Sequence, residues 1–142
     1  MAAAHGNRVV HNEELPEMGR YLCVLLGGGI GSLTRYLLGR AIVQRFPNAQ
    51  FALGTFFINV TGSFLIGVLM TLLVERFRVP HYWQLIAVVG FLGGYTTFSS
   101  FEYDAYLTAR AGNQLGALFY LVSSVVFGYG AVWLGVLLAG KR

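Results

Sequence analysis

The most informative part of the chain is residues 90–101, which read Gly90-Phe91-Leu92-Gly93-Gly94-Tyr95-Thr96-Thr97-Phe98-Ser99-Ser100-Phe101. They end a longer run, residues 79–101, that lacks Asp, Glu, Lys and Arg and is long enough to cross a bilayer as a helix. Three glycines and four Ser or Thr residues in this stretch disfavour a continuous helix. Unwound backbone survives at membrane depth only where protein or a cavity surrounds it. We therefore expect a membrane helix broken near mid-membrane; the alternative is a continuous helix thinned by glycines for close packing.

Three further runs without charged residues accompany this one, at residues 21–34, 51–74 and 115–140. A helix needs roughly 20 residues to cross a hydrocarbon core of about 30 Å, and the first run reaches that length by continuing past Arg35. The pattern predicts an all-α integral membrane protein with four transmembrane helices, the third of them broken. Residues 21–142 form this membrane domain. Residues 1–20, with three glutamates and no apolar run, form an N-terminal tail.

The composition of the chain also indicates a membrane protein. Charged residues make up 11% of the 142 residues, against about 25% in soluble domains, and hydrophobic residues make up 56%. These proportions exclude a soluble globular domain and a disordered chain. The net charge of +4 comes from dispersed basic residues that form no cluster, so no nucleic-acid partner is expected. The three histidines lie in the tail or at a span boundary and no carboxylate pair lies within the apolar runs, so we expect no enzyme.

Basic residues are divided almost evenly between the two sides of the predicted membrane domain. Four spans place both termini and residues 75–78 on one side, with six Lys or Arg residues there and four on the other. Orientation normally follows a clear excess of Lys and Arg in cytoplasmic loops. The weak excess predicts insertion in both orientations; the alternative is a single orientation set by Arg20 and the C-terminal basic pair.

Polar residues within the spans form stripes at helical spacing. Thr55, Asn59 and Ser63 recur every four residues, and Tyr120 and Ser124 do so in the last run. Such a stripe must face protein or water. It either holds helices together by hydrogen bonds or lines a pore with donors that replace the water around an anion.

Glycines, an arginine and two aromatic residues complete the candidate features. Gly27 and Gly31 share one helix face, where small residues let a neighbouring helix approach closely.

Arg35 either extends its charge to the membrane surface or creates an electropositive vestibule for anions. Phe98 and Phe101 share a face if the residues after the break are helical. Because ring edges carry partial positive charge, this pair either packs in the core or holds an anion.

Taken together, residues 27–36, 54–67 and 90–104 closely resemble the Fluc (CrcB) family of bacterial fluoride channels. The resemblance implies an antiparallel, dual-topology homodimer with two pores in the bacterial inner membrane. It implies a passive, fluoride-selective channel that exports fluoride from the cytoplasm. It also implies a structural sodium ion at the dimer centre, held by backbone carbonyls of Gly93 and Thr96 from both subunits.

The same resemblance assigns individual residues. It implies a vestibule role for Arg35. The residues it places along the fluoride pathway are Asn59, Phe98, Phe101, Thr55, Ser99, Ser100, Tyr120 and Ser124. The chain departs from the family pattern at Glu102, where an uncharged residue is usual, and at Asp104, where Glu is frequent; both acids belong to one expected pore mouth.

Two other functions compete with this interpretation. A small four-helix, dual-topology, proton-coupled drug exporter would need an ionisable carboxylate at mid-membrane, and none lies in the predicted spans. In a non-transporting structural subunit, the polar stripes would only bind helices together.

Overall fold

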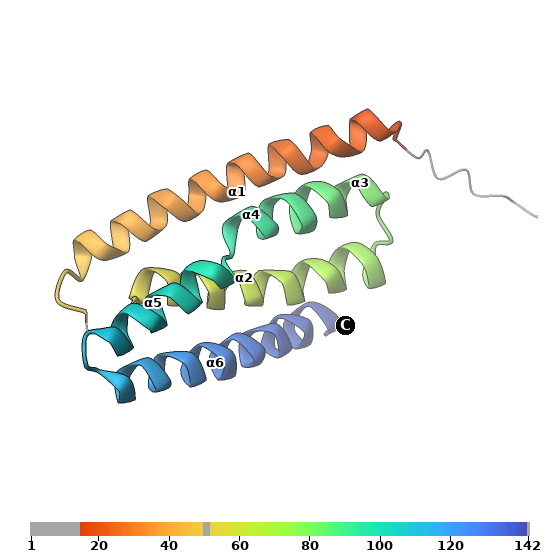
Figure 1. Cartoon of the computed structure of the whole chain (residues 1–142). Coiled ribbons are helices and arrows are strands. Elements are labelled where there is room, and N and C mark those ends of the chain that lie inside the picture. Colours follow the sequence, from red (N-terminus) through yellow and green to blue (C-terminus); the bar gives the residue numbers. More distant parts are fainter. Residues whose placement is uncertain (1–14, 50–51, 142) are drawn as a thin grey trace, which may run out of the picture.

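The computed structural model describes residues 15–49 and 52–141, and every regular element within them is helical. The helices form four rods that run side by side along the length of the molecule (Figure 1). All four rods are long and apolar enough to cross a membrane. The predicted all-helical membrane fold with four spans is confirmed at this level.

Each rod corresponds to one predicted span. The bounds of the elements in chain order are α1 (Glu17–Arg45), α2 (Leu53–Met70), η1 (Thr71–Arg76), α3 (His81–Gln84), η2 (Leu85–Leu92), α4 (Gly93–Tyr95), α5 (Phe98–Arg110) and α6 (Gln114–Gly140). The π-helical segment η1 continues α2, and α3, η2, α4 and α5 follow one another in the third rod.

Three rods extend further than the charge-free runs, the second of them only by Glu75 and Arg76. Helix α1 begins at Glu17, so residues 17–20 of the predicted tail are helical, while residues 1–14 lie outside the described part of the chain. The third rod continues past Phe101 to Arg110, which places Glu102 and Asp104 within a helix. Charged residues can continue a helix into the polar region of a bilayer, so a charge-free run underestimates helix length.

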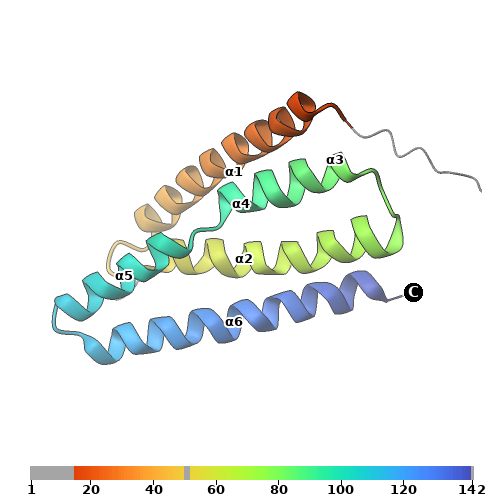
Figure 2. The same cartoon turned by 45° about the vertical axis from the view of Figure 1, so that its right-hand side comes forward.

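The arrangement of the rods puts both ends of the described chain on the same side. The start of α1, the link between η1 and α3, and the end of α6 lie at one end of the molecule (Figure 2). The end of α1, the start of α2 and the turn from α5 to α6 lie at the other end. At the first end, Arg76 Nη1 donates to the carbonyl of Ala139 at 3.3 Å, which satisfies a backbone acceptor at the end of α6.

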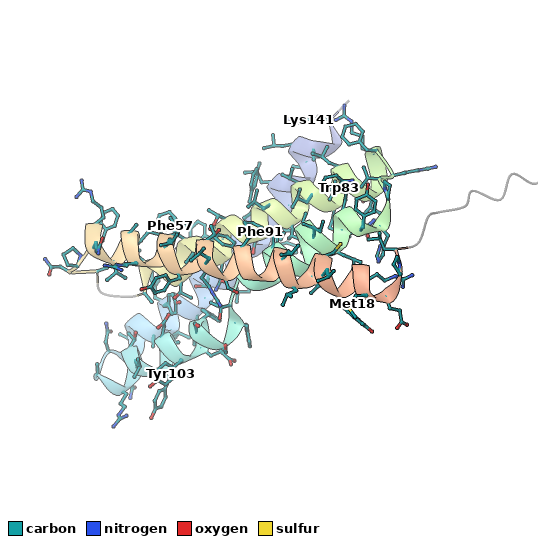
Figure 3. All side chains as sticks on the ribbon, turned by 90° about the horizontal axis from the view of Figure 1, so that it is seen from above. Met18, Phe57, Trp83, Phe91, Tyr103 and Lys141 are labelled. Carbon is teal, nitrogen blue, oxygen red and sulfur yellow. The ribbon has the colours of Figure 1, made fainter. Side chains whose placement is uncertain are left out.

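Most side chains point away from the protein rather than into a core. Only 11–22% of the most apolar window of each span is buried. Apolar side chains surround the bundle, and Met18, Trp83 and Tyr103 are among the exposed ones (Figure 3). The environment that accepts this surface must itself be apolar, as lipid or another membrane-embedded chain is.

Glycines set the distance between α1 and the third rod. Gly27 and Gly31 are buried against the backbone of residues 86–95. A Cβ atom on Gly31 would overlap the carbonyl oxygen of Phe91, so only hydrogen fits there. The close approach expected for Gly27 and Gly31 is therefore present, and it fixes α4 against α1.

We expect Gly31→Ala to destabilise the protein by about 1–3 kcal/mol, because the added methyl group must displace backbone rather than a flexible side chain. Gly29→Ala is the matched control, since a Cβ at Gly29 meets no atom within 4 Å. Thermal unfolding in detergent measures both variants. Equal stability of the two variants would show that the close approach at Gly31 is not constraining.

Candidate functional site

The third rod is interrupted between α4 and α5, at Thr96 and Thr97. Both residues have extended backbone, with φ and ψ of −83° and 159° at Thr96 and −152° and 117° at Thr97. Thr97 is also the N-cap of α5, where its Oγ1 accepts a hydrogen bond from the Ser100 N–H at 3.3 Å. In an uninterrupted helix the Thr97 N–H would donate to the carbonyl of Gly93. In this structure it donates to a side chain of another rod instead.

The side chain of Asn59 supplies the missing partners of the Thr97 backbone. The Thr97 N–H donates to Asn59 Oδ1 at 2.9 Å, and Asn59 Nδ2 donates to the Thr97 carbonyl at 3.0 Å. The Asn59 amide oxygen thus replaces the acceptor that the Thr97 N–H loses at the interruption, and the amide N–H adds a second bond to the Thr97 carbonyl, which as N-cap also accepts the first bond of α5. Asn59 carries two amide hydrogens, and the sequence predicts that its stripe either joins helices or offers such donors to an anion. The structure commits one of them to Thr97 and leaves one.

A second link between the same two rods lies one turn further toward α4. The Tyr95 hydroxyl is 2.8 Å from Thr61 Oγ1, and Thr61 itself donates to the Phe57 carbonyl at 2.6 Å. Because the Thr61 hydrogen is used in that way, Tyr95 is the donor in the first bond. Tyr95 is only 5% exposed and its ring stacks on Phe91. Both the end of α4 and the interruption that follows it are therefore held to α2.

A cavity of about 440 Å³ opens beside the interruption, between the second, third and fourth rods. Its lining is mostly apolar, with amide and hydroxyl groups at a few positions. The lining residues are Asn59, Gly62, Ser63, Ile66, Val88, Val89, Leu92, Gly93, Thr96, Thr97, Phe98, Phe101, Ser124 and Val125. No Asp, Glu, Lys, Arg or His occurs in this lining, so any anion in the cavity meets neutral groups only.

Phe98 and Phe101 stand next to each other at the start of α5. Their ring centroids are 5.8 Å apart and the ring planes are inclined by 47°. Phe101 is 7% exposed, whereas Phe98 is 70% exposed. The spacing of three residues therefore places both rings at the cavity, but only Phe101 is enclosed by its own chain.

A second polar group lies behind Phe101. The ring of Phe101 packs on Tyr120, which is fully buried, with centroids 5.3 Å apart. Near it, Thr55 Oγ1 donates to Asp104 Oδ2 at 2.6 Å. Asp104 also lines a second cavity, of about 570 Å³, which lies between Ala49, Ala52 and residues 104–113. Asp104 is thus half-buried within the third rod, which the sequence did not indicate.

The structure brings together some of the sequence-predicted residues and separates others. Those that line the first cavity are Asn59, Phe98, Phe101, Ser124, Gly93 and Thr96, and Thr55 and Tyr120 lie behind it. Ser99 and Ser100 are exposed on the first turn of α5, and Arg35 is half-buried in α1 away from this lining. Ser63, which shares the stripe of Thr55 and Asn59, lines the cavity although it was not assigned to the pathway.

Comparison with known proteins identifies the family. The family described as "CrcB-like protein, Camphor Resistance (CrcB)" matches residues 22–136. The chain belongs to the CrcB family. It is 55% identical over 122 residues to the fluoride-specific ion channel FluC of Solibacter usitatus, a match that covers 86% of this chain and 99% of the relative. This confirms the resemblance found in the sequence.

Other members of the CrcB family are similar over almost the same length. The fluoride-specific ion channel FluC of Acidobacterium capsulatum is 43% identical over 86% of this chain and 97% of its own. That of Hydrogenobaculum sp. is 46% identical over 84% of this chain and 97% of its own. The CrcB match at residues 22–136 contains the interruption, both cavities and all the residues that line them.

We expect Asn59→Leu to destabilise the protein by about 1–3 kcal/mol, because it leaves the half-buried Thr97 N–H without its acceptor and removes one bond to the Thr97 carbonyl. Ser124→Ala is the control, since the Ser124 hydroxyl bonds only within its own helix, to the Tyr120 carbonyl at 2.7 Å. Chemical unfolding in detergent should rank the two variants. An Asn59→Leu protein as stable as wild type would contradict this role of Asn59.

Proposed function

We propose that the protein is a fluoride-specific channel that lets fluoride pass down its electrochemical gradient. The observation that carries the proposal is the cavity beside the interruption, where amide, hydroxyl and ring-edge groups converge without a formal charge. Membership of the CrcB family, whose relatives are named fluoride-specific ion channels, supports it.

The lining fits the transfer of a small, strongly hydrated anion. The free hydrogen of Asn59 Nδ2 and the ring edges of Phe98 and Phe101 offer partial positive charge to a fluoride ion that has lost water. Conduction requires contacts that are favourable enough to admit the ion and weak enough to release it. A neutral lining meets both requirements better than an arginine or lysine in the cavity would.

The route continues from Phe101 toward the loop end of the molecule. Tyr120 and Thr55 supply hydroxyl groups behind the Phe101 ring, next to the cavity that Asp104 lines. We place Ser124, Ser99 and Ser100 along the same route, and Arg35 at a vestibule that attracts anions. Ser99 and Ser100 are exposed in the single chain, so they can meet a second subunit.

An antiparallel homodimer with two pores accounts for the open side of the cavity. Phe98 is 70% exposed although it lines the cavity, and a second copy is the apolar surface that would cover it. The near balance of basic residues, six against four, favours insertion of the chain in both orientations. We propose that the interruption at Thr96 and Thr97 is a mid-membrane break of the third span.

The same region fits a structural sodium ion. Because the Thr97 N–H is turned toward Asn59, the Gly93 carbonyl loses its usual helical partner. Gly93 is exposed, with no atom within 4 Å of a Cβ built on it, and carbonyl oxygens are suitable ligands for hard cations. A bound sodium ion would offset the charge of these oxygens. Gly93 and Thr96 from two copies are the residues that would hold it.

Passive export follows from the chemistry of hydrogen fluoride, a weak acid. Neutral HF enters a cell from acidic surroundings and dissociates inside, and an inside-negative potential then drives the anion out. The driving force is about 2.3 kcal/mol per charge per 100 mV. We place the protein in the bacterial inner membrane on this basis.

The proton-coupled exporter is the runner-up, and Asp104 is the residue that would serve it. Asp104 lies in the third rod and is half-buried, but it is bonded to Thr55 and lies outside the first cavity. An exporter of cations needs its carboxylate where the substrate binds. A structural subunit, in contrast, would carry no ion at all.

Fluoride efflux from liposomes that contain the purified protein tests the function. We expect rapid efflux from wild type and a loss of about tenfold in Phe98→Ile and Phe101→Ile, which keep apolar bulk but lack the ring edge. Phe119→Ile is the control, because Phe119 is exposed on α6 outside the cavity lining. If wild type carries no fluoride, the channel proposal is wrong. Normal efflux in both Phe98→Ile and Phe101→Ile would show that the two rings only pack against their neighbours and do not contact the ion.

Exchange of the cation tests the sodium site. When a large organic cation replaces sodium throughout purification and assay, we expect the dimer to dissociate more readily and fluoride efflux to fall, because the Gly93 and Thr96 carbonyls then repel each other. Gel filtration and liposome efflux measure the two effects. Indifference of both to sodium would argue against a bound ion.

A further inference from the structure

Most of the side-chain donors in the first cavity, beside the interruption, are already used within the protein. Thr96 Oγ1 donates to the Leu92 carbonyl at 2.9 Å, Thr97 Oγ1 to Ser100 Oγ at 3.0 Å, and Ser124 Oγ to the Tyr120 carbonyl at 2.7 Å. Asn59 has one amide hydrogen left after its bond to Thr97. These groups shape the cavity, but only Asn59 among them retains a hydrogen for a ligand.

Ser63 is different from these hydroxyls. It lines the cavity one helical turn after Asn59, and among the described residues no partner for its hydroxyl is found. Other hydroxyls of the same rod, those of Thr61 and Thr71, turn back to carbonyls of their own helix. Ser63 has that option and does not take it, so its O–H remains available on the cavity side.

The neighbouring helix leaves room at this hydroxyl. Gly128 of α6 faces Ser63, and a Cβ built on Gly128 would lie 3.5 Å from Ser63 Oγ. Because residue 128 is glycine, no side chain covers the Ser63 hydroxyl from that direction. Ser63 and Asn59 are four residues apart on one helix face, so their side chains are spaced by about 5–6 Å.

We propose that Ser63 is a fluoride-contacting residue, an assignment that rests on the proposed fluoride channel. The Ser63 hydroxyl and the remaining Asn59 N–H form two successive positions, one helical turn apart, at which a partly dehydrated fluoride ion accepts a hydrogen bond. Two donors at this spacing let the ion exchange one contact for the next without leaving the cavity.

Fluoride efflux from liposomes tests the assignment with three variants. Ser63→Ala removes the hydroxyl, and we expect the initial rate to fall by about tenfold, the effect of losing one hydrogen bond to a charged partner. Ser63→Thr keeps a hydroxyl and should retain most of the wild-type rate. Ser123→Ala is the matched control, because the buried Ser123 hydroxyl bonds to the Tyr120 carbonyl at 3.2 Å and is not part of the cavity lining.

Gel filtration of each variant establishes that it is folded. If Ser63→Ala does not fold, the nearly isosteric Ser63→Cys, whose thiol is a weak donor, replaces it with the same expected direction. A wild-type rate in the folded Ser63→Ala or Ser63→Cys protein would overturn the assignment and leave the channel function intact. An equal loss in Ser123→Ala would overturn it as well. Absence of efflux from wild type would overturn the channel function and this assignment with it.

Discussion

The N–H of Thr97 needs a hydrogen-bond acceptor at a point where no helix provides one. The N–H and the carbonyl of Thr97 both pair with the Asn59 side chain, at 2.9 and 3.0 Å. In an apolar environment each unpaired group would cost several kcal/mol, so the amide on α2 is a condition for an extended segment at this point. The direction of α5, the position of Phe98 and Phe101 and the shape of the cavity all follow from that pairing.

The helices around this segment hold it by contacts that leave little freedom. Gly27 and Gly31 let α1 touch the backbone of the third rod, and Tyr95 reaches across to Thr61 on α2. The residues before the interruption are thus fixed from two directions. The residues after it are fixed by the Thr97 cap and by the packing of Phe101 on Tyr120. The packed helices α1, α2 and α6 therefore hold the extended segment at Thr96 and Thr97 in place from both ends.

Sequence reasoning was sufficient for the fold because hydropathy and helix length determine membrane spans directly. The four rods, the family and the close approach at Gly31 all followed from residue type and spacing. The ends of the rods did not, because Glu17 and Arg110 continue helices that a charge-free run ends early.

Within the site, residue type and spacing identified the polar face of α2 but not the partners of its side chains. Ser63 and Ser124 are both serines on polar stripes. The Ser124 hydroxyl donates to a carbonyl of its own helix, whereas the Ser63 hydroxyl does not. Asn59 was recognised as a donor, while its bond to Thr97 depends on a neighbouring rod. The Thr55–Asp104 bond joins residues 49 positions apart, a relation that no local pattern contains.

The two phenylalanines at the start of α5 differ in how far their conformation is preorganised. Phe101 is locked by its own chain, so presenting its edge carries no further entropic penalty. Phe98, at 70% exposure, keeps its rotamer freedom until another surface packs on it. In the proposed homodimer, assembly would remove that freedom, so the loss of side-chain entropy would occur once, when the subunits associate, and not each time an ion passes. An isolated chain would hold one defined ring beside one that samples several orientations.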